Sequence, residues 1–179
     1  MIFLSEVITL GRRLNDLNIK IQDKILSNEK LIKLLASKTN DLSDIKEIDC
    51  PNDYVDKNIF FTIKNFEEAV SDSKNLMMMS FKVNSSTPQY ANITIEFIIL
   101  VHKDLQELKN GDGRLWMIID ELCSLFENQE IGTVGRLSLA TSTTVTPPND
   151  YVAFRMAFKC SDFKRNRKRT YRRTKEFFN

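Results

Sequence analysis

The sequence predicts an α+β domain in which N-terminal helices and one central helix pack on an antiparallel sheet of about five strands. Two patterns support this class. Apolar residues recur at helical spacing over residues 14–36 and 115–126, and they alternate at strand spacing over residues 91–102. The chain has 179 residues, of which 42% are hydrophobic, which is enough for one ordinary core. We therefore expect one folded domain over residues 1–163, followed by a basic arm over residues 164–179.

A pair of helices is the first predicted element. Leucine and isoleucine repeat every three to four residues between positions 14 and 36, with charged residues between them. The polar triplet Ser27–Asn28–Glu29 interrupts this repeat. Its serine or asparagine is a good N-cap, and its glutamate suits a first helical turn. We expect a helix, a short break, a second helix that ends near Ser37, and then a polar loop over residues 40–56.

The remaining elements are strands placed around the central helix. We expect strands at residues 59–63, 78–83, 91–102, 135–144 and 151–161. The clearest of them is the strand at residues 91–102. One of its faces is uniformly apolar, and the other changes from polar to apolar along the strand, so we expect one end of this strand to be covered on both faces. Asp112 is the predicted N-cap of the central helix. Turn-forming residues at 146–150 predict a hairpin between the last two strands.

Charge is distributed very unevenly along the chain. The net charge is +2, yet residues 164–175 hold eight Lys or Arg and no acid, which leaves −6 on everything else. An acidic body with a basic tail usually has separate partners for its two parts. The arm ends in a Phe pair, which is typical of an anchor for a hydrophobic pocket. The candidate docking residues are Lys164, Arg165, Arg167, Lys168, Arg169, Arg172, Arg173, Lys175, Phe177 and Phe178.

Three interpretations of this arm remain open. It can dock onto a partner protein, it can contact the phosphate backbone of a nucleic acid, or it can be a solvated arm without a partner. We favour docking, because a general nucleic-acid tail rarely ends in two phenylalanines.

No combination of residues predicts a catalytic site, a metal site or a cofactor. His102 has no Cys-rich or His-rich neighbourhood, although a Cys–His pair that forms only in the fold stays open. Residues 111–114 lack the spacing of a phosphate-binding loop. Asp120 and Glu121 are adjacent on a helix, do not share a face and should lie on its solvated side. Residues 77–79 are three methionines that should alternate between strand faces as core and interface filler.

The cysteines and the apolar segments bear on location. Cys50, Cys123 and Cys160 are odd in number and widely spaced, so they do not predict a disulfide framework. We expect a reducing cytoplasm, or a particle assembled in one. No window reaches the ~18 apolar residues of a membrane span, and the N-terminus lacks the order of a secretory signal. We therefore expect a soluble protein that does not contact a membrane.

Two parts of the chain resemble proteins of tailed bacteriophages. Residues 20–35 resemble the helix–cap–helix opening of tail-completion proteins. Residues 131–139, 149–154 and 158–163 resemble the closing strand pair of tail-terminator and related neck proteins. The resemblance covers roughly residues 14–163 and includes the order of helices and strands. The chain differs from that family in a longer loop after the second helix and in its basic, Phe-tipped arm.

The resemblance implies a structural role in the virion and no enzymatic activity. It implies a ring of six or twelve copies in the neck or tail, which stops growth of the tail tube or joins head to tail while genomic DNA passes through the lumen. Other neck, portal or tail proteins would be its partners, and synthesis would take place in the bacterial cytoplasm. An acidic body fits such a channel, because Lys and Arg would hold the DNA backbone. The alternative is a nucleic-acid-binding protein whose basic arm carries the affinity.

Overall fold

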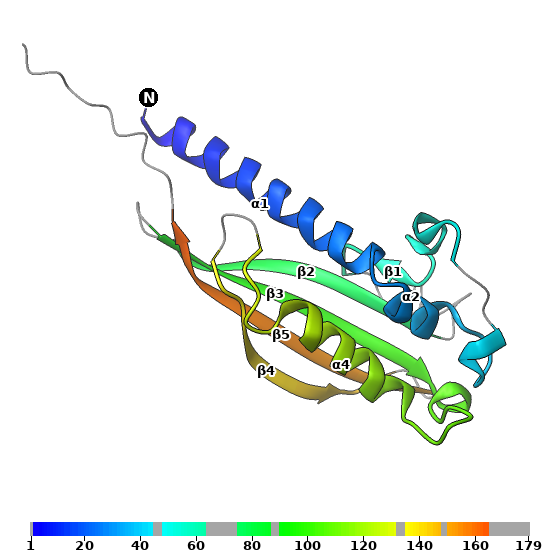
Figure 1. The fold of residues 1–179 in the computed structure, drawn as a ribbon. Coiled ribbons are helices and arrows are strands. Elements are labelled where there is room, and N and C mark those ends of the chain that lie inside the picture. The colour runs from blue at the N-terminus through cyan, green and yellow to red at the C-terminus, as the bar shows by residue number, and fades with distance from the viewer. Residues whose placement is uncertain are drawn as a thin grey trace, which may run out of the picture.

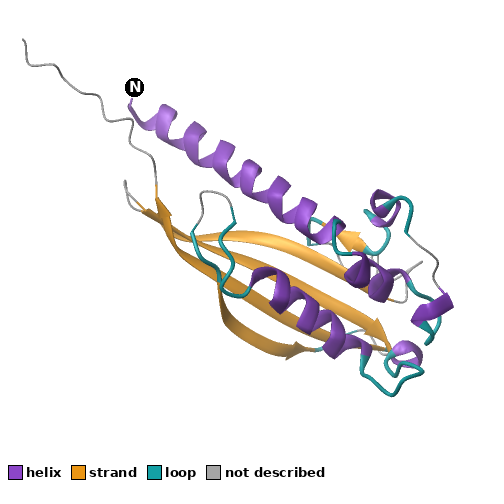
Figure 2. Cartoon of the chain, in the orientation of Figure 1, coloured by secondary structure: helices purple, strands orange, loops and turns teal. Residues whose placement is uncertain are grey.

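One sheet with helices on one of its faces makes up the molecule (Figure 1; Figure 2). The computed structural model describes residues 2–44, 48–63, 75–86, 90–131, 135–147 and 150–164. Its main elements are α1 (Ile2–Leu26), α2 (Glu29–Ala36), β1 (Ile59–Phe60), β2 (Asn75–Ser86), β3 (Tyr90–His102), α4 (Arg114–Phe126), β4 (Ser138–Val145) and β5 (Tyr151–Lys164). The short 3-10 helices are η1 (Leu42–Asp44), η2 (Pro51–Tyr54) and η3 (Lys103–Leu105). The predicted α+β class is confirmed.

The strand order is β1-β2-β3-β5-β4, and all neighbours are antiparallel except β1 and β2. The prediction of a purely antiparallel sheet is wrong at this edge, where β1 pairs in parallel with Met77 and Met78. β1 is also shorter than predicted, because the chain bends at Phe61. The Asn58 side chain fixes this short pairing. Its amide donates to the carbonyl oxygens of Leu35 (3.0 Å) and Asn75 (2.8 Å), which joins β1 to α2 and β2.

The main core lies between the helices and the inner face of the sheet. Leucine and isoleucine side chains from α1, α2 and α4 meet the residues of β2, β3 and β5 that point to this face. At its centre, the Phe97 ring stacks on Phe126 with centroids 5.2 Å apart, and it meets Phe158 edge-on at 6.0 Å. The apolar face predicted for β3 is therefore the face that the helices cover.

A second, smaller cluster lies on the outer face of the sheet. It contains Ile98 and Leu100 of β3, packed with Phe60, Leu76, Met78 and Ala153. The predicted covering of one end of β3 on both faces is confirmed. The three methionines also alternate as predicted. All are fully buried, Met77 and Met79 in the main core and Met78 in the outer cluster.

Local hydrogen bonds explain where the helices begin and end. The predicted break is present, and Asn28 caps α2 by accepting a hydrogen bond from the Leu31 amide at 2.9 Å. α1 begins at Ile2, well before the predicted start, so the apolar opening of the chain is helical. The predicted Asp112 cap is wrong. Gly113 precedes α4, and the Asp112 carboxylate instead accepts from the Asn110 amide at 2.7 Å within the turn.

Candidate functional site

The basic arm leaves the described part of the molecule at the end of β5. β5 extends to Lys164, which pairs with Tyr90 of β3. The other predicted docking residues, Arg165 to Phe178, lie outside the described residues. The candidate surfaces discussed below are therefore those of the folded body: the two sides of the sheet and its outer face.

Both sides of the sheet end in strand edges that have no strand partner in the described part of the chain. β4 is the last strand on one side. On the other side, β1 covers only Met77 and Met78, so the edge of β2 that faces away from β3 has no strand partner from Met79 to Ser86 among the described residues. β4 contains no charged residue and no proline, and three of its eight residues are threonine. Natural edge strands are commonly protected by charge or proline, so β4 is open to strand addition.

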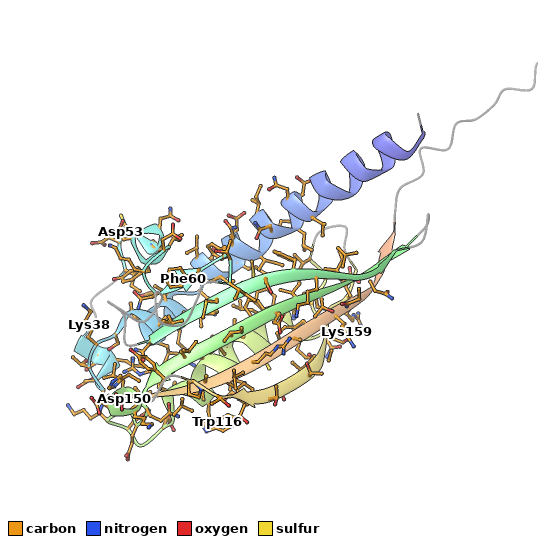
Figure 3. All side chains as sticks on the ribbon, turned by 180° about the vertical axis from the view of Figure 1, so that it is seen from behind. Lys38, Asp53, Phe60, Trp116, Asp150 and Lys159 are labelled. Atoms are coloured by element: carbon orange, nitrogen blue, oxygen red, sulfur yellow. The ribbon has the colours of Figure 1, made fainter. Side chains whose placement is uncertain are left out.

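Exposed apolar side chains lie close to these edges. Val83 of β2 is 42% exposed, and Leu139 of β4 is 39% exposed. Trp116 of α4 is 58% exposed and lies edge-on to Phe154 of β5, with ring centroids 5.8 Å apart. Figure 3 shows Trp116 at the β4 side of the molecule. Aromatic and aliphatic residues that project next to an open edge are typical anchors of a protein interface.

A buried carboxylate with two cations marks the outer face of the sheet. Glu96 of β3 is only 2% exposed, and its Oε2 lies 2.8 Å from Lys82 Nζ on β2. Arg155 of β5 pairs with its other oxygen, Oε1. The Lys82 and Arg155 side chains are about half exposed, so they neutralise Glu96 and still face solvent. This cluster joins the three central strands on the face that the helices do not cover.

A hollow of about 490 Å³ lies beside this cluster. Lys82, Arg155 and Lys159 line it together with Glu96, which leaves a surplus of two positive charges. Figure 3 shows Lys159 on β5 on this face. The hollow could hold a carboxylate or another small anion. The sequence did not predict it, because its residues come from separate strands and no local motif links them.

Arg114 explains the turn that superficially resembles a phosphate-binding loop. Its side chain is fully buried. The guanidinium group donates to the carbonyl oxygens of Leu105 (2.9 Å), Leu34 (2.9 Å), Ser37 (3.1 Å) and Thr39. Burial lowers the pKa of Arg114 to about 10, so the group stays charged at neutral pH. Arg114 therefore points inward and holds the end of α2, so the turn before α4 has a structural role.

The adjacent carboxylates of α4 separate as predicted, but only one of them is solvated. Asp120 is exposed. Glu121 instead lies 2.6 Å from Lys30 Nζ and accepts a hydrogen bond from the Asn28 amide at 3.0 Å. The bond from Lys30 holds the pKa of Glu121 below its usual value. The prediction of a solvated position is wrong for Glu121, which links α4 to α2.

His102 lies at the end of β3, as predicted. Its Nδ1 accepts from the Asp104 amide at 3.3 Å, and its ring meets Tyr151 edge-on at 5.1 Å. The strand register pairs His102 with Tyr151, whereas Cys160 lies nine positions further along β5, about 30 Å away. These two residues therefore do not form a Cys–His pair.

The described residues contain neither a candidate metal-binding cluster nor a helix suited to a membrane. Over the ranges that the structure describes, no three or more His, Cys, Asp or Glu side chains are grouped so that they could hold a metal ion. None of the described helices combines the length and the apolar character that crossing a membrane requires.

A comparison with protein families gives a match that covers most of the chain. No curated protein matches this chain. The model of the YomW family matches residues 28–160, about three quarters of the chain, from the N-cap of α2 to β5. YomW is a phage-type protein name, which indicates a phage-associated protein. Because the match covers well over half of its length, the chain belongs to the YomW family.

Proposed function

We propose that this protein is a structural subunit of a tailed-phage particle. It forms a ring in the neck or tail, where it terminates the tail tube or joins head to tail, and DNA passes through the lumen. The observation that carries this proposal is the open sheet. Both of its sides end in unpaired strand segments with exposed apolar residues, Val83 and Leu139, in the described part of the chain. Such a body is suited to joining copies side by side.

Two further features support an assembly role. Membership of the YomW family indicates a phage association. The polar and charged side chains of the described body build structural contacts, such as the Arg114 cap of α2 and the Glu121 link to Lys30. We propose accordingly that the protein is not an enzyme and that the basic arm docks onto a neighbouring virion protein.

The location of the protein in the particle tests this proposal. Mass spectrometry of purified particles and cryo-electron microscopy of their necks should detect several copies between portal and tail tube. Native mass spectrometry of the purified protein should detect a closed oligomer. A protein that is absent from particles, or a strict monomer that never associates with portal or tail proteins, would contradict the proposal.

The alternative is a nucleic-acid-binding protein, which the eight cations of residues 164–175 favour. Replacing the seven cations from Arg165 to Lys175 with serine leaves β5 and the Phe pair intact. A matched variant carries Phe177→Ala and Phe178→Ala and keeps the cations. If the arm binds DNA, only the serine variant should lose salt-dependent affinity for duplex DNA. If it docks onto a protein, both variants should weaken docking, with little change in DNA affinity.

A further inference from the structure

We infer that β4 of one copy pairs with the unpaired part of β2 in the next copy, so that the sheet continues from subunit to subunit. This inference rests on the proposed ring and names the surfaces that close it. The partner at each edge is a second copy of this chain, presenting the opposite edge. The two segments match in length. β4 has eight residues, and within the described ranges the outer edge of β2 has no strand beside it over the same length, from Met79 to Ser86.

The strand directions permit this pairing without turning a subunit over. β3 is antiparallel to both β2 and β5, and β5 is antiparallel to β4. β4 therefore runs opposite to β2. When two copies stand side by side with their helices on the same face, β4 of one meets β2 of the other in the antiparallel sense, which is the commoner pairing in sheets.

The register of the sheet aligns the exposed apolar residues. On the inner face, Phe81 of β2 pairs with Ile95, Ile95 pairs with Phe158, and Phe158 pairs with Leu139 of β4. This apolar row reaches both edges of the sheet. Val83 lies two positions beyond Phe81 on the same face. In a level continuation, Thr143 and Thr144 would face Met78 and Met77 of the next copy, where β1 already lies. An offset of two residues clears β1 there, keeps each residue on its face and places Leu139 beside Val83 of the next copy, which covers the apolar surface that both edges expose.

The outer face of the two segments is equally compatible. β4 presents Thr141 and Thr143 there, and β2 presents Lys82 and Asn84. Polar residues would thus meet polar residues. Because β4 contains no charge, it brings no like charge to Lys82. Both faces of the predicted contact therefore combine residues of the same character.

Pairing of unlike edges has a geometric consequence. A contact between two different surfaces leaves one free copy of each surface on every pair, so it keeps adding subunits and gives a ring when the rotation between neighbouring copies closes. Pairing of β4 with β4 would instead give a two-fold dimer, and it would leave Val83 and the free part of β2 exposed. The match between Leu139 and the β2 side therefore favours the head-to-tail arrangement.

Cysteine cross-linking tests the inference directly. Two proteins are made in a Cys50→Ser background, one with Val83→Cys and the other with Leu139→Cys, and they are treated with a short bis-maleimide separately and as a mixture. We expect cross-linked species only in the mixture, and a ladder of higher oligomers when both cysteines are in one chain. A matched control pairs Leu139→Cys with Ile19→Cys, which places a thiol on α1 at a position at least as exposed as Val83 and should give no cross-link.

The outcomes separate the possible arrangements. Cross-linking of Leu139→Cys with itself would show β4–β4 pairing and overturn the inference, as would the absence of any link in the mixture. A second measurement uses charge at the edge. Ser142→Lys with Thr144→Lys should convert the oligomer to monomer in native mass spectrometry, because lysines on an edge strand oppose strand addition. Ser124→Lys, the same change at an exposed position of α4, should leave the oligomer intact.

Failure of this inference can be distinguished from failure of the proposed function. If the protein lies in the necks of particles but gives no link between positions 83 and 139, the ring is joined elsewhere and only the inference is wrong. If the links form but particles lack the protein, the edge pairing is real and the neck assignment is wrong.

Discussion

The Nη1 atom of Arg114, on the first turn of α4, donates a hydrogen bond to the carbonyl oxygen of Leu34 in α2 at 2.9 Å. The last carbonyl groups of a helix have no partner within it, and at the end of α2 Arg114 satisfies that of Leu34 while Asn58 satisfies that of Leu35. The same side chain also reaches Ser37 and Thr39 after α2 and Leu105 before α4. One buried cation thus joins α2 and α4 to the loops beside them.

Replacement of this cation should be costly even when the charge is kept. We expect Arg114→Lys to lower the free energy of unfolding by about 3 kcal/mol, because an ammonium group cannot bond four carbonyls that are arranged for a guanidinium, and buried acceptors lose their partners. Urea denaturation measures this change. Arg136→Lys makes the same replacement at an exposed position and should have little effect. Equal stability of the two variants would contradict the role given to Arg114.

The ion cluster on the outer face should depend on its partners. Arg155→Met leaves the buried Glu96 with Lys82 alone, and we expect a loss of about 3 kcal/mol in the free energy of unfolding. The double variant Glu96→Leu with Arg155→Met removes the buried charge as well and should recover much of that loss. Thermal or urea unfolding measures the free energy of unfolding of both variants and tests whether the double variant recovers stability. A double variant no more stable than Arg155→Met would show that Glu96 carries no cost when unpaired.

Glu121 should make stability depend on pH in the acidic range. Its pKa is lowered in the folded state, first by the bond from Lys30 and then by that from Asn28, so its contribution is present above the usual value of 4.5. The contribution is lost as the pH falls below that value. We therefore expect Glu121→Gln to be less stable than the parent near neutral pH, and the two to converge in acid. Urea midpoints measured across this range test the prediction.

The neighbouring carboxylate supplies the control for that experiment. Asp120→Asn removes an exposed charge from the same helix. It should leave the pH dependence of stability close to that of the parent protein. A parallel shift in both variants would indicate a general effect of charge on α4, and it would exclude a specific role of the Lys30 contact.

Much of the fold could be predicted from residues that are close together in the sequence. The alternation along β3 and the interruption at Asn28 are local patterns, and the structure confirms both. The N-cap of α4 was predicted wrongly for a local reason. Asp112 can accept a hydrogen bond either from the helix or from its own turn, and it bonds Asn110. Propensity alone does not distinguish these two partners.

Features that depend on pairing between distant segments could not be predicted. The parallel contact of β1 depends on Asn58 meeting α2 and β2, and nothing in residues 59–63 specifies it. The contact of Glu96 with its two cations could not be predicted either, and neither could the apolar row from Phe81 to Leu139. These residues lie on separate strands, and only the register of the sheet brings them side by side. The two strand edges that form the candidate interface can therefore be identified only from the strand order of the sheet. The predicted docking residues after Lys164 lie outside the described residues and stay a prediction.

The three cysteines should differ strongly in reactivity toward a thiol reagent. Cys50 is exposed, Cys123 is partly buried, and Cys160 is buried. The pKa of Cys123 is raised, chiefly by burial and further by the carboxylates of Glu127 and Asp120, so less of its reactive thiolate is present at neutral pH. We expect Cys50 to react first, Cys123 more slowly, and Cys160 only after unfolding. Mass spectrometry of partly labelled protein identifies the order, and Cys50→Ser should remove the fast phase alone. Rapid labelling of Cys160 in the native protein would contradict the packing of β5 against the helices.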